Sequence, residues 1–121
     1  MDNLDHYVIG STVVNDKEIG EYGLKNLKGL CYINMYSPKR NYLVPQYHTN
    51  QYSFSDVRTF EACKQLFPNL IQLDSGLLVN MSEVEHVEET RFGLYAHFYS
   101  GLKTEIAKNK KDLDIIKRLM K

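Results

Sequence analysis

Residues 67–87 read FPNLIQLDSGLLVNMSEVEHV. This segment is the part of the sequence that indicates more than a soluble domain of mixed α and β structure. Two short apolar pieces, 70–73 and 77–79, flank the polar run Asp74, Ser75 and Gly76. Residues 84–87 then begin one arm of a hairpin. Short apolar runs separated by turn-forming residues are typical of β-strands. The centre of the chain is therefore expected to consist of short strands.

The residues before this segment predict a meander of strands followed by one helix. Strand-forming residues occupy 6–14, 30–36, 42–48 and 52–54, with turn chemistry at 15–16, 37–41 and 50. Pro45 has no backbone N–H, so its strand is expected at a sheet edge or at a bulge. Apolar residues three or four apart predict a helix over 56–67, with Ser55 as its N-cap and Pro68 ending it. The apolar stripe of this helix needs a sheet to pack on.

The residues after the central segment predict a second hairpin and a closing helix. Residues 93–99 alternate as a strand, Ser100 and Gly101 turn, and 102–107 pair back. Residues 112–119 form an amphipathic pattern typical of a helix. The chain has no internal repeat, low-complexity tract or linker, and 121 residues suit one domain, so 1–121 is expected to be a single domain.

Composition and charge narrow the classes of function. Fifteen basic residues balance fifteen acidic ones, and 43% of residues are hydrophobic, which excludes wholesale disorder. No apolar run approaches the roughly 20 residues of a membrane-spanning helix, and the acidic N-terminus has no signal-peptide pattern. We therefore expect a soluble, cytoplasmic chain with no membrane partner.

The charge is unevenly distributed along the chain. Acids outnumber bases in 1–38 and 82–92, whereas bases outnumber acids in 101–121. This asymmetry indicates either a face for an anionic partner or a solvated face of the last helix. The balanced total argues against a simple electrostatic affinity for nucleic acid, because dedicated nucleic-acid-binding domains are usually basic.

Catalytic and metal-binding patterns are missing from the sequence. The four histidines are His6, His48, His86 and His97, and none lies in a motif with Ser or Cys. His86 and His97 fall in predicted strands. Successive side chains of a strand alternate between its two faces, so one of each alternating pair simply faces water. No phosphate-binding loop or metal signature occurs. We expect no catalytic residue, metal, cofactor or small-molecule substrate, and a small enzyme is the weakest reading.

Cysteine and tyrosine each leave two interpretations. Cys31 and Cys63 are expected to be small buried hydrophobes, with a disulfide switch as the alternative. Nine tyrosines suit a half-buried sheet, although a tyrosine-rich sheet could also stack single-stranded bases. Packing is the favoured interpretation for both residue types.

The order of these elements, with Leu78, Val79 and Asn80 at its centre, resembles the LytTR-type DNA-binding domain of bacterial transcriptional regulators. The resemblance covers about residues 5–119. It implies a mainly β fold with α: stacked short antiparallel sheets, one packed helix and a short C-terminal helix. It also implies that loops, and not a recognition helix, contact DNA. Asn80 is expected to be structural, its amide holding the turn after a short helical segment.

The resemblance also implies where DNA is contacted. A basic turn falls on 39–41, a His-Arg-Ser-like step on 74–76, and a Ser-Arg step on 107–109. The resulting DNA-binding residues are Lys39, Arg40, Asn41, Ser75, Lys108 and Asn109. Further cations that could join them in a phosphate-neutralising stripe are Lys103, Lys110 and Lys111.

Two residues depart from the family pattern. Asp74 places a carboxylate where the family commonly has a histidine or a base. That charge would repel phosphate, although it can accept a hydrogen bond from the cytosine amino group. Lys108 replaces an arginine and so loses the planar fork that recognises guanine with two bonds.

The leading hypothesis is a sequence-specific regulator that binds double-stranded promoter DNA and lacks a receiver domain. The sequence leaves open whether the target consists of direct repeats and whether the protein binds them as a homodimer. It also leaves open whether the first 29 residues form strands of the family fold or a separate addition. The alternative is a non-enzymatic module on the same fold that binds a regulatory protein. It is motivated by the balanced charge, Asp74 and the acidic residues of 83–89.

Overall fold

The computed structural model describes the backbone of residues 7–14, 17–40, 42–50, 52–56 and 58–121. Side chains are described from Leu27 onward, except at 38–39, 41–42, 51 and 57. The elements in chain order are β1 (Tyr7–Val14), β2 (Lys17–Asn26), β3 (Leu30–Lys39), β4 (Tyr42–Thr49), β5 (Ser53–Ser55), α1 (Phe60–Leu66), β6 (Ile71–Asp74), β7 (Leu77–Val79), the 3₁₀ helix η1 (Met81–Glu83), β8 (Val84–Thr90), β9 (Gly93–Phe98), β10 (Lys103–Ile106), the 3₁₀ helix η2 (Lys108–Asp112) and α2 (Asp114–Leu119).

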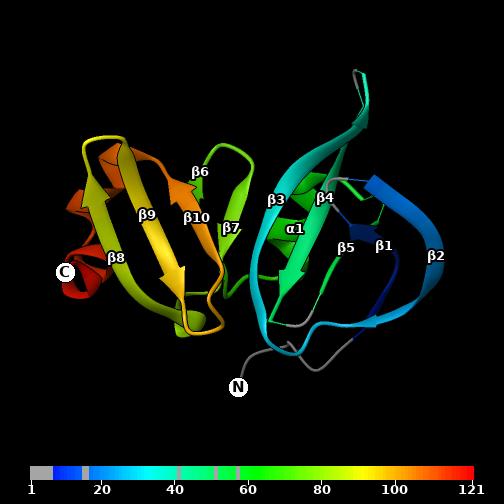
Figure 1. The fold of residues 1–121 in the computed structure, drawn as a ribbon, viewed down its shortest axis with the longest axis horizontal. Helices are drawn as coiled ribbons and strands as arrows, with labels where there is room; N and C mark the ends of the chain where they lie inside the picture. Colours follow the sequence, from blue (N-terminus) through cyan, green and yellow to red (C-terminus); the bar gives the residue numbers. More distant parts are fainter. Residues whose placement is uncertain (1–6, 15–16, 41, 51, 57) are drawn as a thin grey trace.

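The strands form two antiparallel sheets (Figure 1). The larger has the order β2-β1-β5-β4-β3-β7-β6, and the smaller has the order β10-β9-β8. This arrangement confirms the predicted class, mainly β with stacked antiparallel sheets and two helices. It also places the described residues among the first 29, because β1 and β2 pair antiparallel within the larger sheet. Strand β2 was not predicted.

Strand β7 explains how two hydrophobic cores share one sheet. Leu78 packs with Ile33, Tyr47 and other residues in one core. Leu77 and Val79 face the other core, which includes residues of the smaller sheet and Ile116 of α2. Because successive side chains of a strand point to opposite faces, an uninterrupted apolar run suits a strand buried on both faces.

Helix α1 starts later than the sequence predicts. Ser55 belongs to β5, and the N-cap is Thr59, whose Oγ1 accepts a hydrogen bond from the Ala62 amide at 3.1 Å. Asp56, three residues before the N-cap, is buried, where its carboxylate accepts a hydrogen bond from the Tyr47 hydroxyl at 3.0 Å and pairs with Arg58 at 2.9 Å. These contacts anchor Asp56 to the sheet ahead of the helix. The predicted end before Pro68 is confirmed.

Pro45 lies neither in an edge strand nor at a bulge. Strand β4 runs between β3 and β5, and Pro45 pairs in register with Met35 of β3. The pairing of β4 with β5 begins at Gln46. Pro45 is tolerated because the short β5 ends before reaching it.

The C-terminal helix is shorter than the predicted 112–119. Leu113 has an extended backbone, with φ −71° and ψ 136°, and separates η2 from α2. Ile116 is the fully buried residue of α2. Within the described residues, no helix has the length and apolar character needed to cross a membrane.

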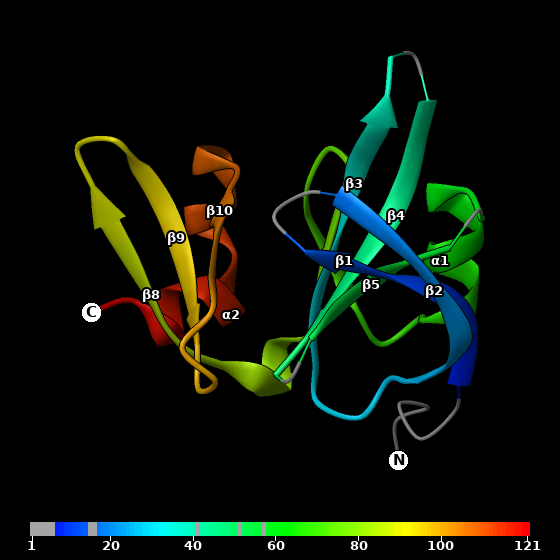
Figure 2. The same cartoon turned by 45° about the vertical axis from the view of Figure 1, so that its right-hand side comes forward.

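The connections between strands gather at two opposite ends of the molecule (Figures 1 and 2). We call one the open end: it carries the β3–β4 hairpin tip, the β6–β7 turn, the β8–β9 turn and η2. We call the other the fixed end: it carries the start of β3, the end of β4, η1 and the β9–β10 turn. Both views share a vertical axis and show the open end at the top.

Candidate nucleic-acid interface

The β6–β7 turn presents Ser75 at the open end. Asp74 pairs with Leu77, so Ser75 and Gly76 alone make the connection. Gly76 has φ 70°, and a Cβ there would meet Cγ of Met35 at 3.0 Å. The Asp74 carboxylate accepts a hydrogen bond from the Ser75 amide at 2.8 Å. The turn is therefore tightly defined while the Ser75 side chain is exposed.

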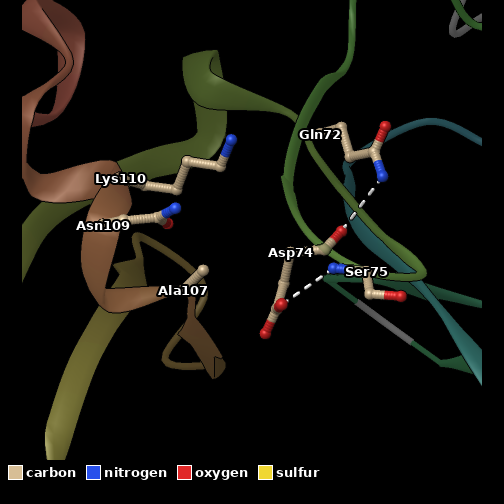
Figure 3. Close-up of a pocket in the computed structure, with 6 residues that line it drawn as sticks. All are labelled: Gln72, Asp74, Ser75, Ala107, Asn109 and Lys110. Atoms are coloured by element: carbon tan, nitrogen blue, oxygen red, sulfur yellow. Dashed lines mark hydrogen bonds between the residues drawn. The ribbon is translucent and has the colours of Figure 1, made fainter.

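The start of η2 lies beside this turn. The Ala107 amide donates to the Leu73 carbonyl at 2.9 Å, which links the end of β10 to β6. Between the two segments lies a polar notch of about 390 Å³ (Figure 3). Its lining residues are Gln72, Asp74, Ser75, Ala107, Asn109 and Lys110. Two predicted site residues, Ser75 and Asn109, thus share one notch.

The other predicted residues are placed separately. Lys108 is exposed and precedes Asn109 in η2 without lining the notch. Arg40 is exposed at the tip of the β3–β4 hairpin, which projects at the same end of the molecule (Figure 2). The side chain of Lys39 and all of Asn41 lie outside the described residues. The open end thus carries Arg40, Ser75, Lys108 and Asn109 on three connections.

The predicted basic stripe is incomplete. Lys103 begins β10 near the fixed end, where its ammonium lies 5.2 Å from the ring centroid of Tyr95. Lys111 pairs with Glu89 of β8 at 3.2 Å. Lys103 therefore does not belong with the cations of the open end. Lys110 does, since it lines the notch.

The β8–β9 turn adds an exposed aromatic residue that the sequence analysis did not single out. Phe92 is 70% exposed, and the Arg91 guanidinium lies 4.9 Å from its ring centroid. The only signal in the sequence is a large apolar residue directly before Gly93, where the next strand begins.

The three histidines among the described residues, His48, His86 and His97, make contacts within the sheets. His86 and His97 lie opposite each other on β8 and β9 with ring centroids 4.5 Å apart, and both are half-buried, so neither simply faces water. His97 Nε2 lies 2.9 Å from Glu88. His48 lies 2.9 Å from both Asn34 and Ser53. Among the described side chains, no cluster of three or more His, Cys, Asp or Glu could hold a metal ion.

Both cysteines are fully buried and unpaired, in different cores. Burial raises the pKa of each thiol above its ordinary value. The structure therefore confirms the packing interpretation and shows no disulfide. Among the tyrosines whose side chains are described, Tyr32, Tyr36 and Tyr47 are buried, whereas Tyr52 and Tyr99 are exposed, so packing accounts for only part of them.

Asn80 is structural, as expected, but precedes the short helical segment instead of following it. Its Nδ2 donates to the Leu30 carbonyl at 2.8 Å, and its Oδ1 accepts from the Ser82 hydroxyl at 2.8 Å. Helix η1 starts at the next residue, Met81. Asn80 thereby ties β7 to the start of β3.

Comparison with solved structures identifies the fold. The chain is similar to the LytTr DNA-binding domain of a Bacillus cereus protein described as a methyl-accepting/DNA response regulator. The match has 9% sequence identity, covers 86% of this chain and 88% of that one, and gives a TM-score of 0.65. No family model matches the sequence, and no curated protein does. The chain therefore has the LytTR-type fold that the sequence resemblance implied.

Proposed function

We propose that residues 1–121 act as one domain that binds double-stranded DNA sequence-specifically, as a bacterial transcriptional regulator without enzymatic activity. The observation that carries this proposal is the notch at the open end, where Ser75 and Asn109 meet from distant segments of a LytTR-type fold. Such a regulator would act in the cytoplasm on promoter DNA. Binding of two copies to direct repeats, as a homodimer on DNA, is part of the same proposal.

Each kind of side chain has a separate role in this proposal. Arg40 and Lys108 neutralise phosphates, as does Lys39, which precedes Arg40 in the sequence, because cations on projecting loops reach the DNA backbone. Ser75, Asn109 and Asn41 offer hydroxyl and amide groups that match base edges. The formal net charge of zero leaves the rest of the protein little general attraction for DNA. Binding therefore depends on this end.

The test is binding to labelled promoter fragments by fluorescence anisotropy over a range of salt concentrations. Arg40→Ala and Lys108→Ala should each weaken binding several-fold and reduce the slope of log affinity against log salt by about 0.9. Lys64→Ala is the matched control, because Lys64 lies on α1 and pairs there with Glu61 at 3.6 Å. It should bind like the parent.

Two results would overturn the proposal. One is the absence of binding at micromolar protein and low salt. The other is an Arg40→Ala/Lys108→Ala double variant that binds with the affinity and salt slope of the parent.

A second candidate function is protein binding, and the β8–β9 turn is the observation that favours it. Phe92 is 70% exposed at the tip of a hairpin whose strand β8 carries Glu85, Glu88 and Glu89 on its exposed positions. Exposed aromatic residues are enriched in protein interfaces. A stoichiometric partner that survives nuclease treatment and is lost with Phe92→Ser would favour this function over DNA binding.

A further inference from the structure

Asp74 is the acidic group of the notch, and its geometry leaves one oxygen available. The Ser75 amide donates to Oδ1 at 2.8 Å, which fixes the orientation of the carboxylate. No described group bonds Oδ2. Figure 3 shows Asp74 on the β6 side of the notch, across from Ala107, with its carboxylate directed toward the bottom of the view. An exposed, oriented acceptor is thus built into the surface proposed to meet DNA.

The opposite wall of the notch supplies donors. Lys110 and Asn109 both belong to η2 and line the notch across from Asp74 (Figure 3). Within the described part of the chain, no ion pair or hydrogen bond joins Asp74 to either residue. The Lys110 ammonium only donates and the Asp74 carboxylate only accepts, so these two groups have fixed and opposite hydrogen-bonding character, whereas the Asn109 amide can donate or accept.

We propose that this notch recognises a C·G base pair in the major groove, with Asp74 as the specificity-determining residue. The carboxylate accepts from the N4 amino group of cytosine, and Lys110 donates to O6 and N7 of guanine. An A·T pair fits less well, because adenine places an acceptor and a donor side by side, which suits an amide. This inference rests on the proposed function and adds the base that is recognised.

The negative charge of Asp74 also has a role in this scheme. Near DNA it repels the phosphates of every sequence, and only a correctly placed amino group offsets that repulsion. Selectivity obtained by penalising the wrong partner costs overall affinity. Asp74 therefore lowers non-specific binding while it favours cytosine.

The experiment selects preferred sites from a random duplex library with the full chain. Competition binding then gives the affinity of every single base-pair substitution in the selected site. At one position, the parent should favour C·G by about 5- to 150-fold over other pairs. Asp74→Ala should reduce this preference below about threefold. Asp74→Asn, which keeps the acceptor for the Ser75 amide, should move the preference toward A·T.

Asp112→Asn is the matched control. Asp112 is an exposed carboxylate at the end of η2 that does not line the notch. Its substitution makes the same change in net charge and should raise the affinity for all sequences without changing any preference. Lys110→Ala should weaken discrimination at the C·G position or the adjacent one.

The outcomes separate this inference from the proposed function. If Asp74→Asn and Asp112→Asn raise affinity alike and leave every preference unchanged, Asp74 acts by charge alone and the inference is overturned while DNA binding stands. If the parent enriches no sequence, sequence-specific binding itself fails and the inference fails with it.

Discussion

The open end and the fixed end of the molecule are built in contrasting ways. At the fixed end, hydrogen bonds join one connection to another. The Asn80 side chain donates to the Leu30 carbonyl, and the Asn50 amide donates to the Gly29 carbonyl at 3.0 Å. The Tyr99 amide donates to the Glu83 carbonyl at 3.1 Å. At the open end, Arg40, Ser75 and Lys108 are exposed. Stability and the proposed binding surface therefore lie at opposite ends, and substitutions should separate them.

The largest effect is expected for Asn80→Ala at the fixed end. Asn80 is 7% exposed, and its loss removes the donor to the Leu30 carbonyl and the acceptor for Ser82. Leaving a buried polar group without its partner costs about 1–3 kcal/mol. We expect the free energy of unfolding to fall by about 2–3 kcal/mol, measured by urea denaturation.

Asn109→Ala is the counterpart at the open end. Asn109 is exposed, so the free energy of unfolding should change by less than about 0.5 kcal/mol while DNA binding weakens. Equal destabilisation by the two substitutions would contradict the contrast between the ends.

Gly29→Ala should have the next largest effect. Gly29 has φ 76°, and a Cβ there would come within 2.6 Å of the Asn50 side chain. Gly101 has φ 97°, and a Cβ there would meet no atom within 4 Å, so Gly101→Ala isolates the backbone strain. We expect losses of about 2 kcal/mol for Gly29→Ala and about 1 kcal/mol for Gly101→Ala, by urea denaturation. Equal losses would show that Asn50 moves aside without cost.

The fold was largely predictable because its signals are local. The apolar run of 77–79 and the alternation of 93–99 indicate strands through their periodicity. The start of α1 was not predictable, because Asp56 is fixed by Tyr47, a residue of another strand. Strand β2 was missed because its apolar residues are separated by glycines and charges, and because its register depends on β1 alone.

The candidate site was predictable only in part. The family resemblance indicated Ser75 and Asn109, but the bond from the Ala107 amide to the Leu73 carbonyl brings them together, and no spacing in the sequence reveals it. For the same reason, the sequence analysis wrongly grouped Lys103 with the cations of the open end. A strand rises about 3.3 Å per residue, so β10 carries the chain away from the fixed end before η2 begins. Neighbours in a basic segment therefore lie far apart.

Alkaline pH should weaken the fold through its buried thiols. Burial raises the pKa of Cys31, at the fixed end, and of Cys63, the buried residue of α1, above the ordinary value of 9.0. Below about pH 8 the thiols are neutral in both states. As the pH rises through 9, the unfolded chain loses its thiol protons first, so stability falls by at most about 0.8 kcal/mol per thiol by pH 9.5.

Urea denaturation in reductant at pH 7.5, 8.5 and 9.5 measures this loss and stays below 10.0, the ordinary pKa of Tyr32, which burial also raises. Cys31→Ala and Cys63→Ala should each flatten the pH dependence. A parent protein whose stability is unchanged over this range would contradict the prediction, because it would indicate that water reaches both Cys31 and Cys63 in the folded state.

The smallest effect is expected where the open end is held by a surface ion pair. Lys111 of η2 lies 3.2 Å from Glu89 of β8, and both side chains are about half exposed. Exposed pairs typically contribute about 0.2–1 kcal/mol and are screened by salt. Glu89→Gln should therefore lower the free energy of unfolding by less than about 0.5 kcal/mol, and 0.5 M salt should abolish the difference from the parent. The same substitution releases a cation beside the proposed interface and removes a charge that repels phosphate, so DNA affinity at low salt should rise. A loss of stability as large as that of Asn80→Ala would mean that a surface ion pair at the open end stabilises the fold as much as the buried bonds of the fixed end, and the contrast between the two ends would no longer hold.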